Sequence, residues 1–296
     1  MELEIPTGEE DVRQRQWTLA QQRLTPPGGG RRISEAVNGD MVAGLRFYGT
    51  QAPVQIDHEH LLRLEDRQWL SSSLCSFYCY EVGNAYLEGD IGRSMDLVVL
   101  HCNTWSLGKP NHPGPSRLRH ENAPSPLEYK FVAFPANETE DHFFLCIIAW
   151  ASDLLADLNP GGPVHTTVFI LNSSAHLQPS NAQKSVQNIV KHLSCGRAIR
   201  EEELQTITVH FPSVPQQPNS YDCGLYPGHF LSVFLSAPDT YTAHCLGKQT
   251  IAGSLDEIWC HEDVQFAREN LRDLVASAIV IRQAALDFSV DRPGLS

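Results

Sequence analysis

The sequence is organised around the stretch Val214-Pro215-Gln216-Gln217-Pro218-Asn219-Ser220-Tyr221-Asp222-Cys223-Gly224. An apolar, β-rich run at 207–211 precedes it, and a second apolar run at 225–235 follows it. This order predicts a strand, a polar loop, a cysteine and a helix. A thiol at the start of a helix faces the positive end of the backbone dipole and free amide donors, which favour the thiolate. The pattern therefore predicts that Cys223 is a nucleophile.

The same stretch offers further groups for catalysis. Gln217 lies six residues before Cys223 and has an amide that can donate to an oxyanion, with its neighbour Gln216 as a competitor for that role. Asp222 is more typical of a helix N-terminal or ion-paired carboxylate than of a catalytic acid. The plainer alternative for Cys223 is a buried structural thiol.

Composition limits the classes of function. The chain has 296 residues, 42% hydrophobic and 19% charged, which is ordinary for a globular protein with a sizeable core. The net charge of −13 (22 basic against 35 acidic residues) argues against nucleic acid or an anionic membrane as partner. A basic protein surface is favoured instead.

Cysteine usage and the terminus point to a reducing compartment. The start Met1-Glu2-Leu3-Glu4 lacks the features of a signal peptide, and no apolar run has the length of a membrane span. The eight cysteines lie scattered, mostly within apolar runs, as in reduced proteins of the nucleus or cytoplasm. Neither Cys260-His261 nor His244-Cys245 has metal-ligand spacing, so no metal site is predicted.

The hydrophobic pattern predicts an α+β fold without internal repeats. Residues 1–33 are predicted to be a disordered leader, 34–296 a single catalytic domain, and 106–128 a long loop. The predicted strands are 53–57, 95–101, 129–134, 143–150, 164–171 and 207–211. The predicted helices are 33–47, 58–64, about 72–86, 181–193, 225–235 and 262–286.

The segment from Gln217 to Gly224 resembles the active-site signature of the SUMO-type, ubiquitin-like-modifier cysteine proteases, Gln-x-Asn-x-x-Asp-Cys-Gly. The resemblance implies a papain-like fold with a central mixed sheet flanked by helices. It also implies cleavage after the C-terminal Gly-Gly of SUMO or a related modifier, with no cofactor. Asn219 and Asp222 belong to the signature and are candidate substrate-binding residues.

The resemblance also supplies a base and its orienting partner, which the family places upstream in the order His, then Asp. His142 fits the base, because it opens the apolar run at 143–150. The position of the orienting Asp holds Asn172, with Asp153 and Asp157 as weaker substitutes. An Asn oxygen can orient an imidazole, as in papain-like enzymes, but it cannot stabilise an imidazolium by charge. We expect a lower His pKa, and an Asn172→Asp variant that keeps or raises turnover.

Two aromatic residues are candidates for the wall of the narrow tunnel that admits the glycines of the substrate tail. Trp69 begins a Trp-Leu-Ser-Ser segment that resembles the family's Trp-Leu-Asn-Asp, and its serines can still cap the following helix. Phe143 stands where the family usually has Trp after the catalytic His. The alternative for Trp69 is an aromatic side chain packed in the core or against a helix.

Two other functions remain open at this point. The changes to Asn172 and Phe143 are compatible with a non-catalytic module that binds the modifier, and the same scaffold also supports acyltransferases. For the protease, the expected partners are a SUMO-type modifier and its conjugates, and the expected state is a monomer.

Overall fold

The computed structural model describes residues 56, 58–89, 93–109, 125–138 and 142–290. The predicted leader (1–33), the predicted helix at 33–47, nearly all of the predicted strand at 53–57 and most of the predicted loop at 106–128 lie outside the described residues. Among the described helices, none has the length and hydropathy needed to cross a bilayer.

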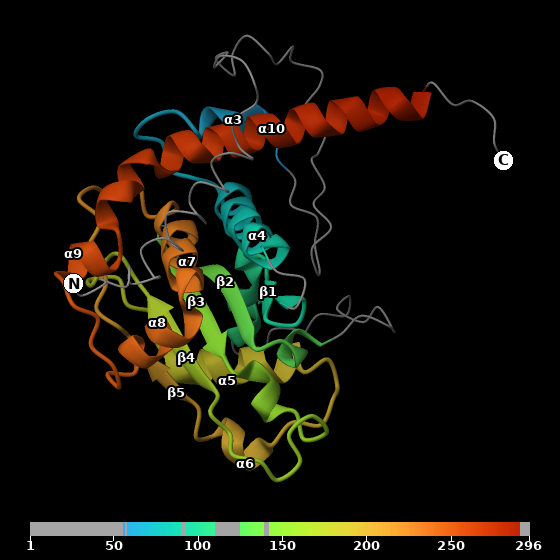
Figure 1. The fold of residues 1–296 in the computed structure, drawn as a ribbon, viewed down its shortest axis with the longest axis vertical. Coiled ribbons are helices and arrows are strands. Elements are labelled where there is room, and N and C mark those ends of the chain that lie inside the picture. The colour runs from blue at the N-terminus through green and yellow to red at the C-terminus, as the bar shows by residue number, and fades with distance from the viewer. Residues whose placement is uncertain (1–55, 57, 90–92, 110–124, 139–141, 291–296) are drawn as a thin grey trace, which may run out of the picture.

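In the described part of the chain, five strands form one mixed sheet in the order β1-β2-β3-β4-β5 (Figure 1). They are β1 (Leu97–Val99), β2 (Phe131–Asn137), β3 (Phe143–Ala149), β4 (Thr167–Leu171) and β5 (Thr208–His210). The outer pairs β1–β2 and β4–β5 are parallel, and β2–β3 and β3–β4 are antiparallel. The prediction that 143–150 forms a central strand is confirmed, because β3 is buried along its whole length.

Successive residues of the sheet alternate between two hydrophobic cores, as the pleat requires. One core packs β1 to β4 against α4 (Ser72–Glu88), α7 (Tyr226–Ser236) and α10 (Val264–Val290). The other packs the opposite face against α5 (Ala182–Leu193) and η2 (Cys102–Gly108). The predicted α+β fold is confirmed, with helices on both faces of the sheet.

The remaining elements connect this framework. They are α3 (His58–Leu62), η3 (Pro126–Glu128), η4 (Ala151–Leu154), α6 (Glu201–Leu204), α8 (Pro238–Cys245), α9 (Leu255–Ile258) and η5 (His261–Asp263). The long helix α10 runs beside α3 along one end of the molecule (Figure 1), where Arg268 of α10 donates a hydrogen bond to the carbonyl of Arg63 just after α3.

Several predicted boundaries were wrong by a few residues. The strand predicted at 129–134 continues to Asn137, because Asn137 pairs with Phe143 across the β2–β3 ladder. The acidic pair predicted to open the last helix lies in η5, and α10 begins at Val264. The predicted cap of the helix at about 72–86 is confirmed. Ser71 is the N-cap of α4, and its hydroxyl accepts a hydrogen bond from the Leu74 amide at 3.3 Å.

Candidate active site

The candidate base and its orienting group lie at the same end of the sheet. His142 directly precedes β3 and Asn172 directly follows β4, and these two strands are antiparallel neighbours. The end of one therefore meets the start of the other, although the residues are 30 positions apart in sequence. His142 Nε2 lies 2.6 Å from Asn172 Oδ1, and both residues are buried.

The hydrogen bonds of Asn172 fix which way its amide points. Its Nδ2 donates to the Leu177 carbonyl at 3.0 Å, and its Oδ1 accepts from the Ser174 amide at 2.9 Å. The oxygen therefore faces His142, so Nε2 of the imidazole must carry the proton. In the neutral ring this leaves the Nδ1 lone pair free to accept a proton. Asn172 is held as an amide, with both ends of the group satisfied.

The candidate nucleophile lies in a turn in front of α7 and is not its first residue. Helix α7 begins at Tyr226, and the preceding turn is closed by a 2.8 Å hydrogen bond from the Leu225 amide to the Asp222 carbonyl. Cys223 is only 4% exposed and packs with Phe143 and Cys75. The expectation of a cysteine at the helix N-terminus is thus corrected by one turn.

The sulfur of Cys223 contacts the residue that follows the candidate base in the chain. The backbone N–H groups of Phe143 and Gly224 both hydrogen-bond to it and lower its pKa. Because Phe143 follows His142 directly in the chain, the sulfur lies beside the backbone that carries the imidazole. The structure thus pairs His142 with Asn172 and places Cys223 against Phe143, the residue next to His142.

Electrostatics differ from the sequence-based expectation of a stabilised thiolate. Burial raises the pKa of the Cys223 thiol above its ordinary value, and this effect exceeds the lowering by the backbone N–H groups. Burial also lowers the pKa of His142, against an opposing effect of the Asn172 hydrogen bond. Both shifts favour the uncharged forms of the thiol and the imidazole.

The two candidate glutamines tie the loop before Cys223 to the segment after β4. Gln217 Oε1 accepts from the Ser173 hydroxyl at 2.8 Å, and Gln217 Nε2 donates to the Asn219 carbonyl at 2.6 Å. The competitor Gln216 is exposed, and its Oε1 accepts from the Ala175 amide at 2.6 Å. An amide nitrogen carries two hydrogens, so Gln217 retains one donor for a substrate atom.

The other two signature residues make contacts within the chain. Asn219 Oδ1 accepts from the amides of Tyr221 and Asp222, and Asn219 Nδ2 donates to Asp222 Oδ2 at 2.8 Å. Asp222 Oδ1 pairs with Arg268 at 2.7 Å, as expected for an ion-paired carboxylate. Both side chains shape the turn that presents Cys223, and their contact with substrate stays a prediction.

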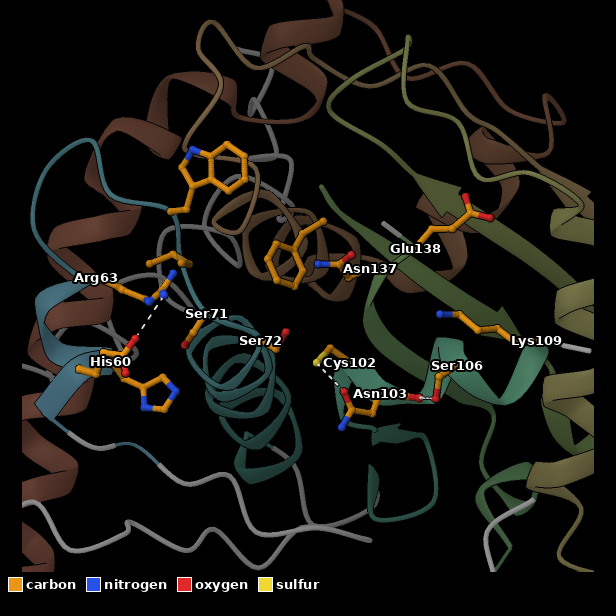
Figure 2. A pocket seen from close by; sticks show the side chains of 14 residues that line it. His60, Arg63, Ser71, Ser72, Cys102, Asn103, Ser106, Lys109, Asn137 and Glu138 are labelled. Carbon is orange, nitrogen blue, oxygen red and sulfur yellow. Dashed lines mark hydrogen bonds and ion pairs between the residues drawn. The ribbon is translucent and has the colours of Figure 1, made fainter. Parts of the chain in front are cut away.

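The two candidate tunnel residues, Trp69 and Phe143, line one pocket of about 410 Å³. Trp69 is 43% exposed, so the alternative of a core aromatic is wrong. Figure 2 shows this pocket bounded on one side by His60, Arg63, Ser71 and Ser72 and on the other by Cys102, Asn103, Ser106 and Lys109. Phe143, which lines the pocket, also packs against the candidate nucleophile Cys223.

The two substitute carboxylates are engaged elsewhere. Asp153 accepts hydrogen bonds from the backbone and ring nitrogens of His165, and Asp157 pairs with Arg197. Sequence reasoning missed Arg268, which lies on the buried face of α10. Its signal was a charged residue in the stripe formed by Val264, Ala267, Leu271 and Val275. Nowhere in the described residues do three or more metal-ligating side chains cluster.

The family is shown by a match that covers more than half of the sequence. The model of the Ulp1 protease family, C-terminal catalytic domain, matches residues 102–269, which is more than half of the chain. With the papain-like fold and the pairing of His142 with Asn172 at one end of the sheet, this match defines the class of a cysteine peptidase domain. The chain belongs to the Ulp1 protease family.

Individual relatives are distant. The chain is 23% identical over 274 residues to Ubiquitin-like-specific protease 2 of Schizosaccharomyces pombe, a match covering 77% of this chain and 41% of that protein. The chain thus spans about two fifths of this curated relative.

Solved structures share the fold. A de-sumoylating protease superposes with a TM-score of 0.63 at 18% identity, covering 83% of this chain and 95% of that one. The SUMO protease Ulp1, with its catalytic cysteine oxidised to a sulfenic acid, superposes with a TM-score of 0.50 at 16% identity, covering 94% of this chain and 98% of that one.

Proposed function

We propose that this chain is a cysteine protease that cleaves after the C-terminal Gly-Gly of SUMO or a related ubiquitin-like modifier. The leaving group is either a precursor peptide or a lysine of a modified protein. One observation carries the proposal: His142, oriented by Asn172, directly precedes Phe143, and Phe143 both lines the pocket and packs against Cys223. Membership of the Ulp1 protease family supports the substrate class.

The first step follows from the tautomer of His142. Because Nε2 donates to Asn172, Nδ1 is the position that accepts the thiol proton of Cys223. The sulfur attacks the carbonyl carbon of the terminal glycine as this proton moves to Nδ1, forming a tetrahedral intermediate. Burial favours the uncharged forms of both groups, and this supports charge separation together with bond formation.

Oxyanion stabilisation falls to donors on the nucleophile loop. The Cys223 backbone N–H and the second hydrogen of Gln217 Nε2 are the proposed donors. The Ser173 hydroxyl donates to Gln217 Oε1 and so fixes the orientation of the Gln217 side-chain amide. Loss of one such donor typically costs about 10²- to 10³-fold in turnover.

Collapse of the intermediate returns the proton. The His142 imidazolium protonates the departing amine, which leaves Cys223 as a thioester. Water, activated by the same imidazole, then hydrolyses the thioester and restores the thiol. Asn172 orients the ring through both steps by hydrogen bonding alone.

Selection for glycine is assigned to the pocket. Trp69 and Phe143 line it together, and the N-terminus of α4 with Ser71 and Ser72 forms an adjoining wall. The proposed role of these two aromatic side chains is to admit only a tail without side chains, which is the property of Gly-Gly.

A panel of fluorogenic substrates, each carrying the C-terminus of a different modifier, tests the proposal. The wild type should release the fluorophore from SUMO-type substrates, and Cys223→Ser should not. Absence of cleavage for every modifier, with the wild type folded, would remove the proposed activity.

A non-catalytic module that binds the modifier is the second candidate. It is favoured by the raised pKa of Cys223 and by the neutral amide that serves as the partner of His142. A modifier bearing a C-terminal vinyl sulfone separates the two functions. Labelling at Cys223 supports the protease, whereas binding without labelling supports the module.

A further inference from the structure

The guanidinium of Arg268 is buried at the junction of three segments. Its side chain is 8% exposed, and it lies on the stripe of α10 that faces the core. A buried charge is costly unless it is paired and its hydrogen-bond donors are satisfied. Arg268 meets this requirement with acceptors from two separate parts of the candidate active site.

All four hydrogens of its terminal nitrogens have acceptors. Nη1 donates to the carbonyls of Arg63 at 3.0 Å and Glu65 at 3.2 Å. Nη2 donates to the carbonyl of Gln68 at 2.9 Å and to Asp222 Oδ1 at 2.7 Å. The three carbonyls belong to the segment between α3 and α4, and the carboxylate belongs to the turn before α7.

Arg268 thus holds two segments. One carries Trp69, the candidate wall of the pocket for the substrate tail (the tail wall), and the other carries the candidate nucleophile Cys223. The first leads directly to Trp69, and in the second the paired Asp222 directly precedes Cys223. They also touch each other, because a Cβ added to Gly224 would lie 2.8 Å from Leu70 Cβ. The segment between α3 and α4, which contains Leu70, approaches Gly224 so closely that the signature ends in a glycine here.

We propose that Arg268 is a positioning residue that sets Trp69 and Cys223 in register, so that a tail seated against the wall presents its carbonyl to the sulfur. The inference rests on the proposed function and names a determinant of the same site. A guanidinium suits the task because its planar fork serves four acceptors at fixed angles, which a lysine ammonium with three donors cannot do.

The chain contains a matched control one turn further along the same helix. Arg272 Nε donates to the Leu64 carbonyl at 2.9 Å, and its Nη2 pairs with Asp66 at 2.8 Å. Both of these bonds go to the segment after α3, and neither reaches the turn that carries Cys223. Comparing Arg268→Met with Arg272→Met therefore separates coupling to the nucleophile from anchoring of the segment.

The test measures kcat and KM on a SUMO-type fluorogenic substrate and the rate at which iodoacetamide alkylates Cys223, followed by peptide mass spectrometry. For Arg268→Met we expect kcat to fall roughly 10- to 100-fold and KM to rise, because a small displacement of reacting groups is that costly. The alkylation rate at Cys223 should also change. Arg272→Met should keep kcat within about twofold, since partly exposed ion pairs contribute little.

Equal losses in the two variants, or an unchanged kcat in folded Arg268→Met, would overturn the inference. Thermal unfolding measured on both variants checks the fold. Should Arg268→Met fail to fold, Arg268→Lys against Arg272→Lys gives the same comparison with the charge retained. A wild type that cleaves no modifier substrate removes the proposed function, whereas alkylation of Cys223 across the variants still decides the role of Arg268.

Discussion

The two halves of the candidate active site are held in place by different kinds of structure. His142 and Asn172 lie at the ends of antiparallel strands, and the register of β3 and β4 brings them together. Cys223 lies in a turn whose shape depends on side chains, namely Asn219 within the loop and Arg268 from α10. The base half is therefore fixed by backbone pairing, and the nucleophile half by contacts that single substitutions can remove.

This difference indicates where the site tolerates change. A ladder of backbone hydrogen bonds does not depend on any one side chain, so substitutions in the base half act on chemistry more than on geometry. The nucleophile half is held by side chains instead, and its geometry is the quantity that substitutions there will alter. The following predictions test this contrast, beginning with the largest expected effect.

Removal of the base should have the largest effect. His142→Gln deletes the group that accepts the thiol proton, so kcat should fall by roughly 10³-fold or more, in line with losses of catalytic histidines elsewhere. The measurement is steady-state cleavage of the best fluorogenic substrate. His165→Gln is the control, because His165 is exposed and pairs with Asp153. Similar losses in both variants would remove His142 from the reaction.

The orienting residue should respond in two different ways. Asn172→Ala removes the partner of Nε2 and should lower kcat by roughly 10²- to 10⁴-fold. The hydrogen bond from Nδ2 to the Leu177 carbonyl reverses the sequence-based expectation for Asn172→Asp, because a carboxylate oxygen there faces another acceptor. We therefore expect kcat of Asn172→Asp to fall about 10-fold, because a buried acceptor is left unpaired beside the Leu177 carbonyl. Turnover at or above wild type in Asn172→Asp would contradict this.

The pH dependence should report a neutral resting pair. Because burial raises the pKa of Cys223, alkylation by iodoacetamide should be slow at pH 7 and rise only above about pH 8.5, the range of an ordinary thiol or higher. Because the pKa of His142 is lowered, the imidazole is still unprotonated as the pH falls through about 6.5. The value of kcat/KM should therefore stay constant through that pH and decline only at lower pH, where the imidazole becomes protonated. A thiolate–imidazolium pair would instead give fast, pH-independent alkylation across neutral pH.

The smallest expected effect concerns the contact between Leu70, in the segment before α4, and Gly224, in the turn that carries Cys223. Gly224→Ala places a Cβ 2.8 Å from Leu70 Cβ, and Gly83→Ala places one 2.6 Å from Val99 Cγ2 in another part of the core. Overpacking of this kind costs about 1–3 kcal/mol, so thermal unfolding should shift down in both variants. Only Gly224→Ala should also lower kcat, by several-fold. A parallel loss of kcat in Gly83→Ala would show that the effect is one of general stability.

The nucleophile loop was predictable because its information is local. The signature around Cys223, the strand before it and the helix after it lie within one continuous stretch. The central strand β3 was equally clear, since a short run of consecutive apolar residues is typical of a strand buried on both faces. The partners His142 and Asn172 could be placed only through family order, because their meeting depends on the register of β3 and β4.

What the sequence could not supply was burial. The helix dipole argument predicted a favoured thiolate at Cys223, but desolvation by burial has the larger effect on the pKa of the thiol. The role of Arg268 was invisible for a related reason. Three of its four partners are backbone carbonyls about 200 positions away, and carbonyls leave no mark in a sequence.

The buried, uncharged sulfur of Cys223 has a consequence for inhibitor chemistry. A simple electrophile meeting the protein in solution reacts with thiolates, so the more exposed cysteines elsewhere in the chain compete for it. Under the proposed function, a covalent inhibitor selective for this protein needs a flat, glycine-like arm that fits the pocket lined by Trp69 and Phe143. Recognition by that arm, more than the strength of the warhead, would then determine which cysteine is modified.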